Sequence, residues 1–275
     1  MLTDYHVHLR PDDPGATPDR YFTDQNVERY LDAAREAGIE ELGVSEHIYR
    51  FRDALAIGRH PLWEELASDD LGAYCEFVRT TPLRLGIEAD FIVGAEDRLA
   101  GVLEQHDFDY VVGSVHQMDG GRMVDHAGWD VWEDTADADR MWGRYFGLVA
   151  EAVRCGLFDV LAHPDLVKMW GPERPWPERD PRFHYEPAVE AIAERGIAVE
   201  LSTAGLRKPV GEMYPSREFC EMCVDAGAAF ALSSDAHAPE QVGYEYGRAT
   251  ELLRELGVGE ICVFERRERR LEAIG

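Results

Sequence analysis

The sequence predicts an α/β fold in which parallel strands alternate with helices and close into a barrel. Short runs of apolar and β-branched residues recur along the chain, separated by segments with apolar residues at helical spacing. The runs are apolar almost throughout, which is typical of parallel strands covered by helices. A chain of 275 residues has the length of an α/β barrel, so a closed barrel is favoured over an open, doubly wound sheet. We therefore expect a single domain over residues 1–275.

The candidate strands differ in length but share their apolar character. They lie at residues 2–6, 41–45, 83–89, 109–113, 159–163, 197–202 and 229–234. Helices are expected at 24–37, about 139–155, 183–195 and 215–226. In the first helix, Asp24 can cap the start and Gly38 can end the last turn. A further strand at 260–264 is expected to pack beside the barrel.

Two connections are longer than the others. Residues 114–137 and 164–182 are rich in Gly, Pro, Trp and charged residues. Long loops on a barrel are usually functional. The tryptophans that could form walls for a small substrate are Trp129, Trp132, Trp170 and Trp176.

Charge and cysteine content argue against several classes of function. The chain has 28 Lys and Arg against 54 Asp and Glu, a formal charge of −26, which repels polyanions, so we expect no nucleic-acid partner. No apolar run approaches the ~18 residues of a transmembrane helix, so we expect no membrane partner. Five cysteines and no recognisable signal sequence fit a cytoplasmic protein. Cys220 and Cys223 form a CxxC that we interpret as buried helix cysteines.

Histidine and carboxylate residues recur where the predicted strands end. His6 and His8 form an HxH on the first strand, and a period of two turns both imidazoles to one side. The later strands end in ligand types of the same kind: His47, Glu88, His116, His163, Asp235 and His237. Because the strand ends of a barrel converge, we expect these side chains to meet at its C-terminal mouth.

The expected ligand set points to a cluster of metal ions. Imidazole and carboxylate ligands without thiolate suit Zn, Mn or Fe. Eight ligands are too many for one ion, so we expect two or three divalent ions, with Glu88 or Asp235 as a bridge. Clustered ions activate water and hold a phosphoryl group between them.

The motifs HVH, SEH, GIEADF, DYVVGSVH, DVLAHPD and SSDAH resemble those of the PHP (polymerase and histidinol phosphatase) family. The resemblance extends from His6 to about Gly243. Within it, the stretches GIEADF, FDYVVGSVH, LSTAGLRKP and SSDAHAPEQVG are similar to the stand-alone histidinol-phosphate phosphatases.

The resemblance implies a distorted barrel of seven strand–helix units and a division of the ligands among three ions. It assigns His6, His8, Glu88 and Asp235 to one ion, Glu88, His116 and His163 to a second, and His47 and His237 to a third. Several relatives have a further His shortly after the HxH, where this chain reads LRPDDPGA. Asp12, or else Asp13, could replace it as an oxygen ligand, or the third site could be weak or empty.

A phosphate dianion also needs fixed positive charge. Arg207 in TAGLRKP follows the sixth strand and matches an Arg of the resembled phosphatases, so it is the first candidate for binding phosphate. Lys168 is the second candidate and Arg50 the third, and for each the alternative is a solvated surface charge. His126, in the loop 114–137, could contact the substrate or protonate the leaving alkoxide.

These expectations describe a metal-dependent phosphatase with Glu88, Asp235, Arg207 and His126 as catalytic residues. The substrate that the resemblance implies is L-histidinol phosphate, hydrolysed to L-histidinol and phosphate in histidine biosynthesis. Three alternatives remain open. They are a related phosphoesterase acting on nucleotides or phosphotyrosine, an amidohydrolase, whose barrels also open with HxH, and a non-catalytic module stabilised by metal. The oligomeric state is not predicted.

Overall fold

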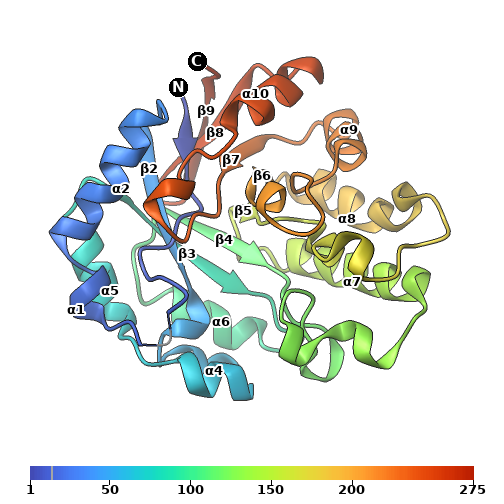
Figure 1. Cartoon of the computed structure of the whole chain (residues 1–275), viewed down its shortest axis with the longest axis horizontal. Coiled ribbons are helices and arrows are strands. Elements are labelled where there is room, and N and C mark those ends of the chain that lie inside the picture. The colour runs from blue at the N-terminus through green and yellow to red at the C-terminus, as the bar shows by residue number, and fades with distance from the viewer. Residues whose placement is uncertain (14) are drawn as a thin grey trace.

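The computed structural model describes residues 1–13 and 15–275, which contain the predicted barrel (Figure 1). Within them, seven parallel strands pair in chain order from β1 to β7. The strands are β1 (Thr3–Asp4), β2 (Glu41–His47), β3 (Arg84–Asp90), β4 (Tyr110–Ser114), β5 (Val160–Leu161), β6 (Ala198–Ser202) and β7 (Phe230–Ser233). Because all neighbours are parallel, the carboxyl ends of the strands lie at one end of the barrel.

The first and last strands also meet, so the sheet closes into a barrel rather than staying open. Val7 and Ala236 form a parallel bridge, in which His8 N donates to Ala236 O at 2.8 Å. Nearby, the buried Asp4 carboxylate accepts hydrogen bonds from the backbone N–H and the hydroxyl of Ser234, at 3.0 and 2.5 Å. These contacts exclude the doubly wound sheet.

Aromatic rings fill the interior at the N-terminal ends of the strands. The fully buried Tyr110 ring occupies the space beside Gly43 and Gly86, and a Cβ atom at either glycine would collide with it. Residues of β8 (Glu260–Glu265) pack onto the same cluster, and β8 pairs with β9 (Glu268–Ala273) as an antiparallel hairpin. The strand expected at 260–264 therefore packs against the N-terminal end of the barrel, and β9 was not predicted.

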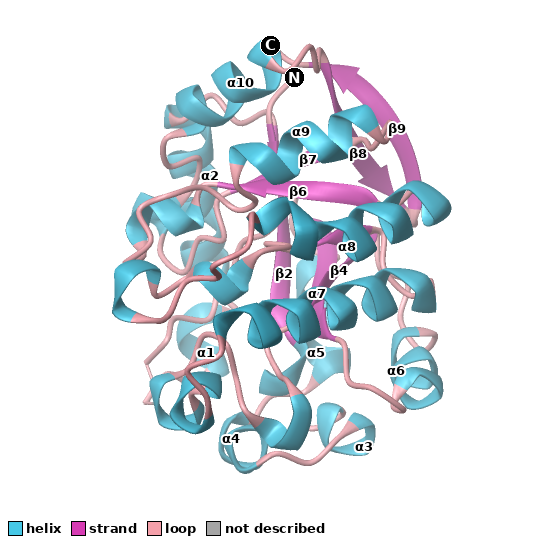
Figure 2. Ribbon diagram, turned by 90° about the vertical axis from the view of Figure 1, so that its right-hand side faces the viewer, coloured by secondary structure: helices cyan, strands magenta, loops and turns pink. Residues whose placement is uncertain are grey.

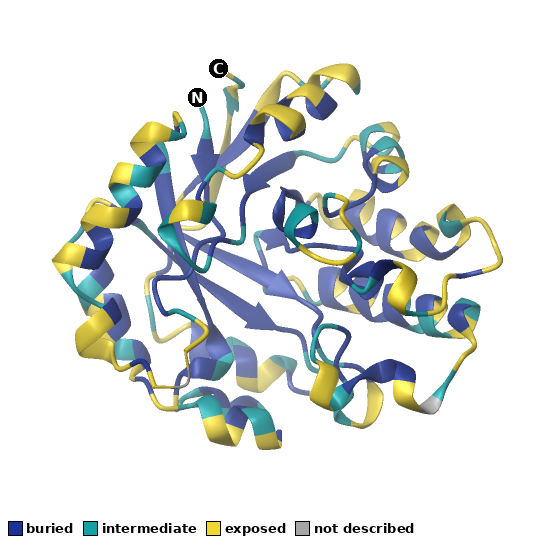
Figure 3. Cartoon of the chain, in the orientation of Figure 1, coloured by how far each residue is buried: buried dark blue, intermediate teal, exposed yellow. Residues whose placement is uncertain are grey.

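Helices cover the outer side of the strands, and their exposed faces point to solvent (Figures 2 and 3). Within the described ranges they are α1 (Pro18–Tyr21), α2 (Asp24–Glu36), α3 (Ala54–Ile57), α4 (Pro61–Leu66), α5 (Leu71–Val78), α6 (Glu96–Leu103), α7 (Ala138–Cys155), α8 (Pro181–Arg195), α9 (Arg217–Asp225) and α10 (Tyr246–Glu255). The helix α2 starts at Asp24 as predicted, but the expected capping residue is corrected, because Thr23 rather than Asp24 accepts the capping bond from Asn26 N. Gly38 follows the helix in the left-handed conformation, as its expected role requires.

The two long loops, after β4 and after β5, are tied to each other. Trp170 Nε1 donates to the carbonyl of Val124 at 2.8 Å, and Arg174 Nε donates to the Asp130 carboxylate at 2.8 Å. The edge of Trp176 packs against Trp142 of α7. Trp170 and Trp176 therefore hold these loops in place.

The structure also bears on the expected helix cysteines and on whether any helix could cross a membrane. Cys220 and Cys223 lie fully buried on α9 and are free thiols, in agreement with the expected buried helix cysteines. None of the helices in the described part of the chain has the length and apolar character needed to cross a membrane.

Candidate metal centre

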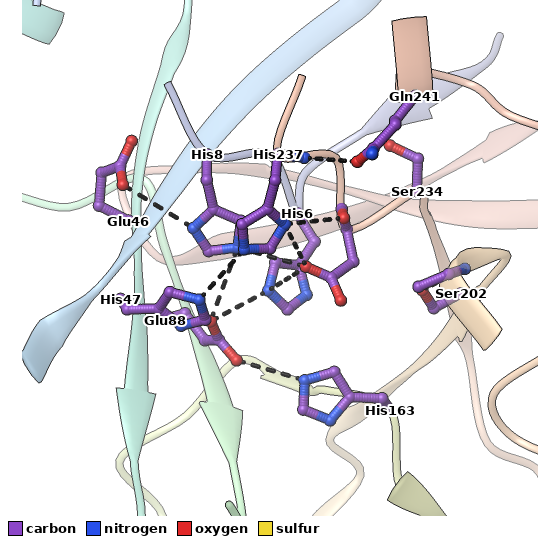
Figure 4. Close-up of polar contacts among 12 residues, drawn as sticks. His6, His8, Glu46, His47, Glu88, His163, Ser202, Ser234, His237 and Gln241 are labelled. Atoms are coloured by element: carbon purple, nitrogen blue, oxygen red, sulfur yellow. Dashed lines mark hydrogen bonds and ion pairs between the residues drawn. The ribbon is translucent and has the colours of Figure 1, made fainter. Parts of the chain in front are cut away.

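The contact that closes the barrel also positions four ligands. Val7 and Ala236 are fully buried in the main hydrophobic core. Side chains alternate in direction along an extended chain, so the neighbours of Val7 and of Ala236 point toward the mouth of the barrel. These residues are His6, His8, Asp235 and His237. Figure 4 shows the three imidazoles grouped beside Glu88. His237 is held from behind by its backbone N–H, which donates to Gln241 Oε1 at 2.8 Å.

Glu88, near the end of β3, lies at the centre of the site and is completely buried. Its Oε2 lies 3.3 Å from His6 Nε2 and 3.7 Å from His8 Nε2. Its Oε1 lies 3.3 Å from Nε2 of both His116 and His163. One carboxylate thus faces imidazoles from three different strand ends, which is the position of a bridging ligand.

His47, at the end of β2, joins Glu88 to the outer part of the site. Its Nδ1 contacts Glu88 Oε2, and its Nε2 lies 3.3 Å from His237 Nε2. The ring also stacks on His8, with the ring centres 4.2 Å apart. All eight residues expected at the strand ends are therefore brought together at one mouth.

Three sets of ligand atoms lie within 4.8 Å of one another. The sets are His6, His8 and Asp235; His6, Glu88 and His163; and His8, His47 and His237. They resemble the expected three-ion division, with four differences. His8 lies with His47 and His237 as well as with Asp235, and His6 lies with Glu88 and His163 as well as with Asp235. Glu88 is absent from the set of His6, His8 and Asp235, and His116 contacts Glu88 but stands outside the three sets.

Opposite charges set the protonation of the central groups. Burial alone would raise the pKa of Glu88, but the surrounding imidazoles, His47 first, hold it well below its ordinary value. The pKa of Asp235 is likewise held well below its ordinary value, against the effect of burial, by His6 and its neighbours. Both carboxylates are therefore ionised at neutral pH.

Burial favours the neutral form of the two outer imidazoles. Burial lowers the pKa of His47 well below its ordinary value, and burial followed by the charge of His8 lowers the pKa of His237 to about 4. Neutral imidazole is the form of histidine that binds metal. His237 and Asp235 retain 21% and 15% side-chain exposure, so the site opens to solvent on this side.

Unpartnered polar atoms show that the residues fit bound metal. Several buried nitrogens and oxygens of the centre have no hydrogen-bond partner among the described residues, although such atoms normally have one. They are His6 Nε2, His8 Nδ1, His8 Nε2 and, although these two form an ion pair with each other, His47 Nδ1 and Glu88 Oε2. These atoms come from imidazoles and a carboxylate that point at one another, and divalent transition-metal ions satisfy such a donor set.

Three carboxylates that sequence reasoning missed hold the imidazoles from behind. Glu200 Oε1 lies 2.7 Å from His6 Nδ1, and Asp90 Oδ1 lies 2.7 Å from His116 Nδ1. Glu46 Oε2 lies 3.8 Å from His8 Nδ1. Carboxylates of this kind fix the orientation of metal-binding histidines.

The sequence contains signals for two of these carboxylates. Asp90 stands two residues after Glu88, on the same side of the strand, and Glu200 is a lone acid in the otherwise apolar run IAVELS. Neither signal gives the histidine that the acid contacts, because the partners come from other strands.

Backbone strain coincides with two of the ligands. His163 and Asp235 have positive φ angles of 21° and 49°, a conformation that few residues other than glycine adopt. Strain of this kind is concentrated at functional sites, where the surrounding structure enforces it. Here it turns the chain sharply just beyond β5 and β7.

Arg207 lies beside the outer ligands. It ends the short 3-10 helix η7 (Ala204–Arg207) that follows β6, and its Nη2 donates to the carbonyls of Ser234 and Asp235 at 2.8 and 2.9 Å. Its Nη1 is buried and has no hydrogen-bond partner within residues 1–13 and 15–275 as far as their side chains are described. A guanidinium with a free donor next to Asp235 can bind an anion at the mouth.

The contacts of Lys168 do not favour its expected role in binding phosphate. Its side chain is fully buried, and Nζ lies 2.9 Å from Asp165 Oδ2 and 2.6 Å from Glu212 Oε2. A buried ammonium that is already paired with two carboxylates has no free charge to offer a phosphate. The lysine instead ties the loop after β5 to the segment after β6.

Arg50 and His126 also have other partners. Arg50 is buried against Glu46 Oε2 at 2.9 Å and Asp12 Oδ1 at 2.6 Å, so its charge is compensated within the protein. His126 Nδ1 accepts the backbone N–H of Gly128 at 3.1 Å and caps a 3-10 turn of the loop. These contacts do not favour direct binding of phosphate by Arg50 or proton transfer by His126.

Asp12 lies at the rim of the site. Its Oδ1 is 3.8 Å from His237 Nε2, and its side chain is 70% exposed. It belongs to none of the three ligand sets. The third ion would therefore be held chiefly by imidazoles, with Asp12 within reach of His237.

Fold and site together define a metal-binding α/β barrel. The chain belongs to the PHP domain family, whose sequence model matches residues 22–204, more than half of the chain. The probable histidinol-phosphatase of Deinococcus radiodurans is 34% identical over 241 residues, covering 87% of this chain and 90% of that protein.

Two further proteins show how widely the similarity extends. The probable histidinol-phosphatase of Schizosaccharomyces pombe is 24% identical over 266 residues, covering 87% of this chain and 84% of that protein. The crystal structure of histidinol phosphate phosphatase from Lactococcus lactis, a complex with zinc, L-histidinol and phosphate, has a TM-score of 0.74. At 18% identity it covers 98% of each chain and supports the fold.

Proposed function

We propose that this protein is a metal-dependent phosphatase that hydrolyses L-histidinol phosphate to L-histidinol and inorganic phosphate. The convergence of strand-end imidazoles on the buried Glu88 carboxylate carries this proposal. The choice of substrate is supported by similarity to proteins named as histidinol-phosphatases.

Two or three divalent ions, of Zn, Mn or Fe, would be held by the three ligand sets around Glu88, with His116 beside them. Such ions supply an activated water and positive charge for the phosphoryl oxygens. Glu88 and Asp235 provide the negative charge that keeps cations in the site, and Glu200 and Asp90 keep the His6 and His116 rings in a fixed orientation.

Arg207 would bind the phosphoryl group from the open side of the site. Its position is fixed by Nη2, which donates to two backbone carbonyls, and Nη1, which has no hydrogen-bond partner among the described residues, is the donor left for a phosphate oxygen. The aromatic ring of Tyr244, 5.4 Å from the guanidinium carbon, packs against its other face. A single preorganised donor of this kind strengthens phosphate binding in the ground state and in the transition state.

Domain organisation, compartment and partners also belong to the proposed function. We propose that residues 1–275 act as one barrel domain in the cytoplasm, on a small phosphate ester. The charge of −26 opposes binding of nucleic acid. An amidohydrolase is disfavoured because Lys168 is buried in ion pairs and Lys208 lies after β6, so neither is available at a strand end.

A phosphate-release assay on the purified chain tests the proposal. L-histidinol phosphate is compared with AMP, phosphotyrosine and p-nitrophenyl phosphate, after loading with Zn, Mn or Fe and again after chelation. We expect the highest kcat/KM with histidinol phosphate and loss of turnover with chelator. Preference for AMP or phosphotyrosine would indicate a different phosphoesterase, and no release with any metal would overturn the proposal.

A further inference from the structure

Asp125, in the long loop after β4, lies at the metal centre but belongs to none of its ligand sets. Its Oδ2 is 4.0 Å from His116 Nε2, and its side chain is 28% exposed. Its Oδ1 is buried and makes no hydrogen bond within the described part of the chain. A buried carboxylate oxygen without a partner is costly, so it indicates a group that the protein itself does not supply.

The backbone holds Asp125 firmly in this position. The preceding residue, Val124, donates its N–H to the carbonyl of His116 at 3.0 Å and accepts Trp170 Nε1 at 2.8 Å. Met123 N donates to Trp129 O at 2.7 Å. The loop is therefore folded back onto the end of β4 and clamped by the neighbouring loop, and the carboxylate is placed before any ligand arrives.

The charge of Asp125 suits an organic cation. Its Oδ1 needs a donor that the described part of the chain does not supply, and the N–H groups of an ammonium or imidazolium are such donors.

Asp125 and Arg207 lie at two separate positions around the mouth of the barrel. Asp125 follows β4, whereas Arg207 lies between β6 and β7, and β7 in turn meets β1. A small molecule with its anionic group at Arg207 and its cationic group at Asp125 would lie across the candidate metal ligands around Glu88. A phosphate ester that carries a protonated nitrogen has both charges.

We propose that Asp125 binds the cationic nitrogen of the substrate and thereby selects phosphomonoesters that carry an amine or imidazole. This inference rests on the proposed function, because it assigns a substrate contact within the same site. It makes Asp125 a specificity residue, and it requires no bond to a metal ion.

The test compares Asp125→Asn with Asp119→Asn in the zinc-loaded full chain. Asp119 belongs to the same loop and pairs with Arg144 at 2.7 Å, with 67% of its side chain exposed, so its substitution removes the same charge away from the mouth. L-histidinol phosphate supplies the cation, and p-nitrophenyl phosphate lacks it. We expect Asp125→Asn to raise KM for histidinol phosphate at least about tenfold and to change KM for p-nitrophenyl phosphate by a much smaller factor. Asp119→Asn should change neither.

Calorimetric titration with L-histidinol provides a readout that is independent of turnover. We expect the Kd to rise by a similar factor in Asp125→Asn alone, with zinc content equal to that of the wild type. Equal losses with both substrates, or a lower zinc content, would overturn the inference in favour of a structural or metal-binding role. If the wild type hydrolyses only p-nitrophenyl phosphate, the proposed function fails, and the L-histidinol titration still decides the role of Asp125. Wild-type protein that does not bind L-histidinol would overturn it.

Discussion

Behind His6, the Glu200 carboxylate faces two nitrogens from different strands. Oε1 lies 2.7 Å from His6 Nδ1, and Oε2 accepts the backbone N–H of His163 at 2.7 Å. In Glu200→Gln one carboxylate oxygen becomes an amide NH2 group. This group must face either His6 Nδ1 or the His163 N–H, and it cannot accept a hydrogen bond from either. We expect zinc affinity or turnover to fall by about 10- to 100-fold, measured by chelator competition and phosphate release. Glu194→Gln, on the exposed face of α8, is the control, and equal zinc affinity in both variants would argue against a positioning role.

Substitution of Glu88 should cause the largest loss of turnover. Glu88→Gln keeps the size of the side chain but removes the negative charge that faces His6, His47, His116 and His163. We expect turnover to fall by more than about 100-fold, a larger effect than loss of an outer carboxylate, and bound zinc to decrease. Phosphate release and elemental analysis measure the two effects, with circular dichroism as the check on folding. Wild-type turnover in this variant would refute the central role of Glu88.

The residues of the site differ in how far the sequence could predict them. His6, His8 and His163 were predictable because strand ends in a barrel converge, so chain position alone indicates proximity. The second partners of charged groups were not predictable. Lys168 finds Asp165 and Glu212, and Asp125 lies beside His116, only because loops fold back over the mouth.

At the scale of elements, the barrel depends on glycines that make room for the Tyr110 ring. A Cβ atom at Gly86 would collide with this ring, whereas a Cβ at Gly101 on α6 meets nothing within 4 Å. We expect Gly86→Ala to lower the free energy of unfolding by about 1–3 kcal/mol. Gly101→Ala should raise it by about 0.5–1 kcal/mol, because alanine favours the helix. Urea unfolding measures both changes, and a Gly86→Ala protein as stable as the wild type would show that Tyr110 can move aside.

The elements that the sequence predicted well are those with a long, regular apolar pattern. The helix expected at 139–155 is α7 (Ala138–Cys155), and the strand expected at 83–89 is β3 (Arg84–Asp90). The helices between β2 and β4 are only four to eight residues long, so the apolar pattern of each covers too few turns for periodicity to reveal it. The exposed β9 hairpin strand has the burial pattern of a surface segment.

At the scale of the whole molecule, ligands from distant parts of the chain share the same cations, so metal binding should stabilise the fold. Zinc that binds only the folded chain adds about 2.7 kcal/mol at 100 times its Kd. The gain should depend on pH. Although burial opposes it, the charges of Asp125, Asp90 and Glu88 raise the pKa of His116 to about 10, and the charges of Glu200 and Glu88 raise the pKa of His6 well above its ordinary value. Without metal these two imidazoles hold protons at neutral pH, and zinc must displace them.

Displacing a proton costs less free energy as the pH rises, so zinc should stabilise the fold more at higher pH. The increase in Tm on adding zinc to chelator-treated protein should be larger at pH 8 than at pH 6, as measured by calorimetry. Zinc binding at pH 7 should release protons, which appears as a dependence of the binding enthalpy on the ionisation enthalpy of the buffer. In Glu88→Gln both effects should shrink, because the charge that gathers the imidazoles is missing. A zinc-induced rise in Tm that is greater at pH 6, or absent at both values, would mean that the buried imidazoles are not the groups that bind the metal.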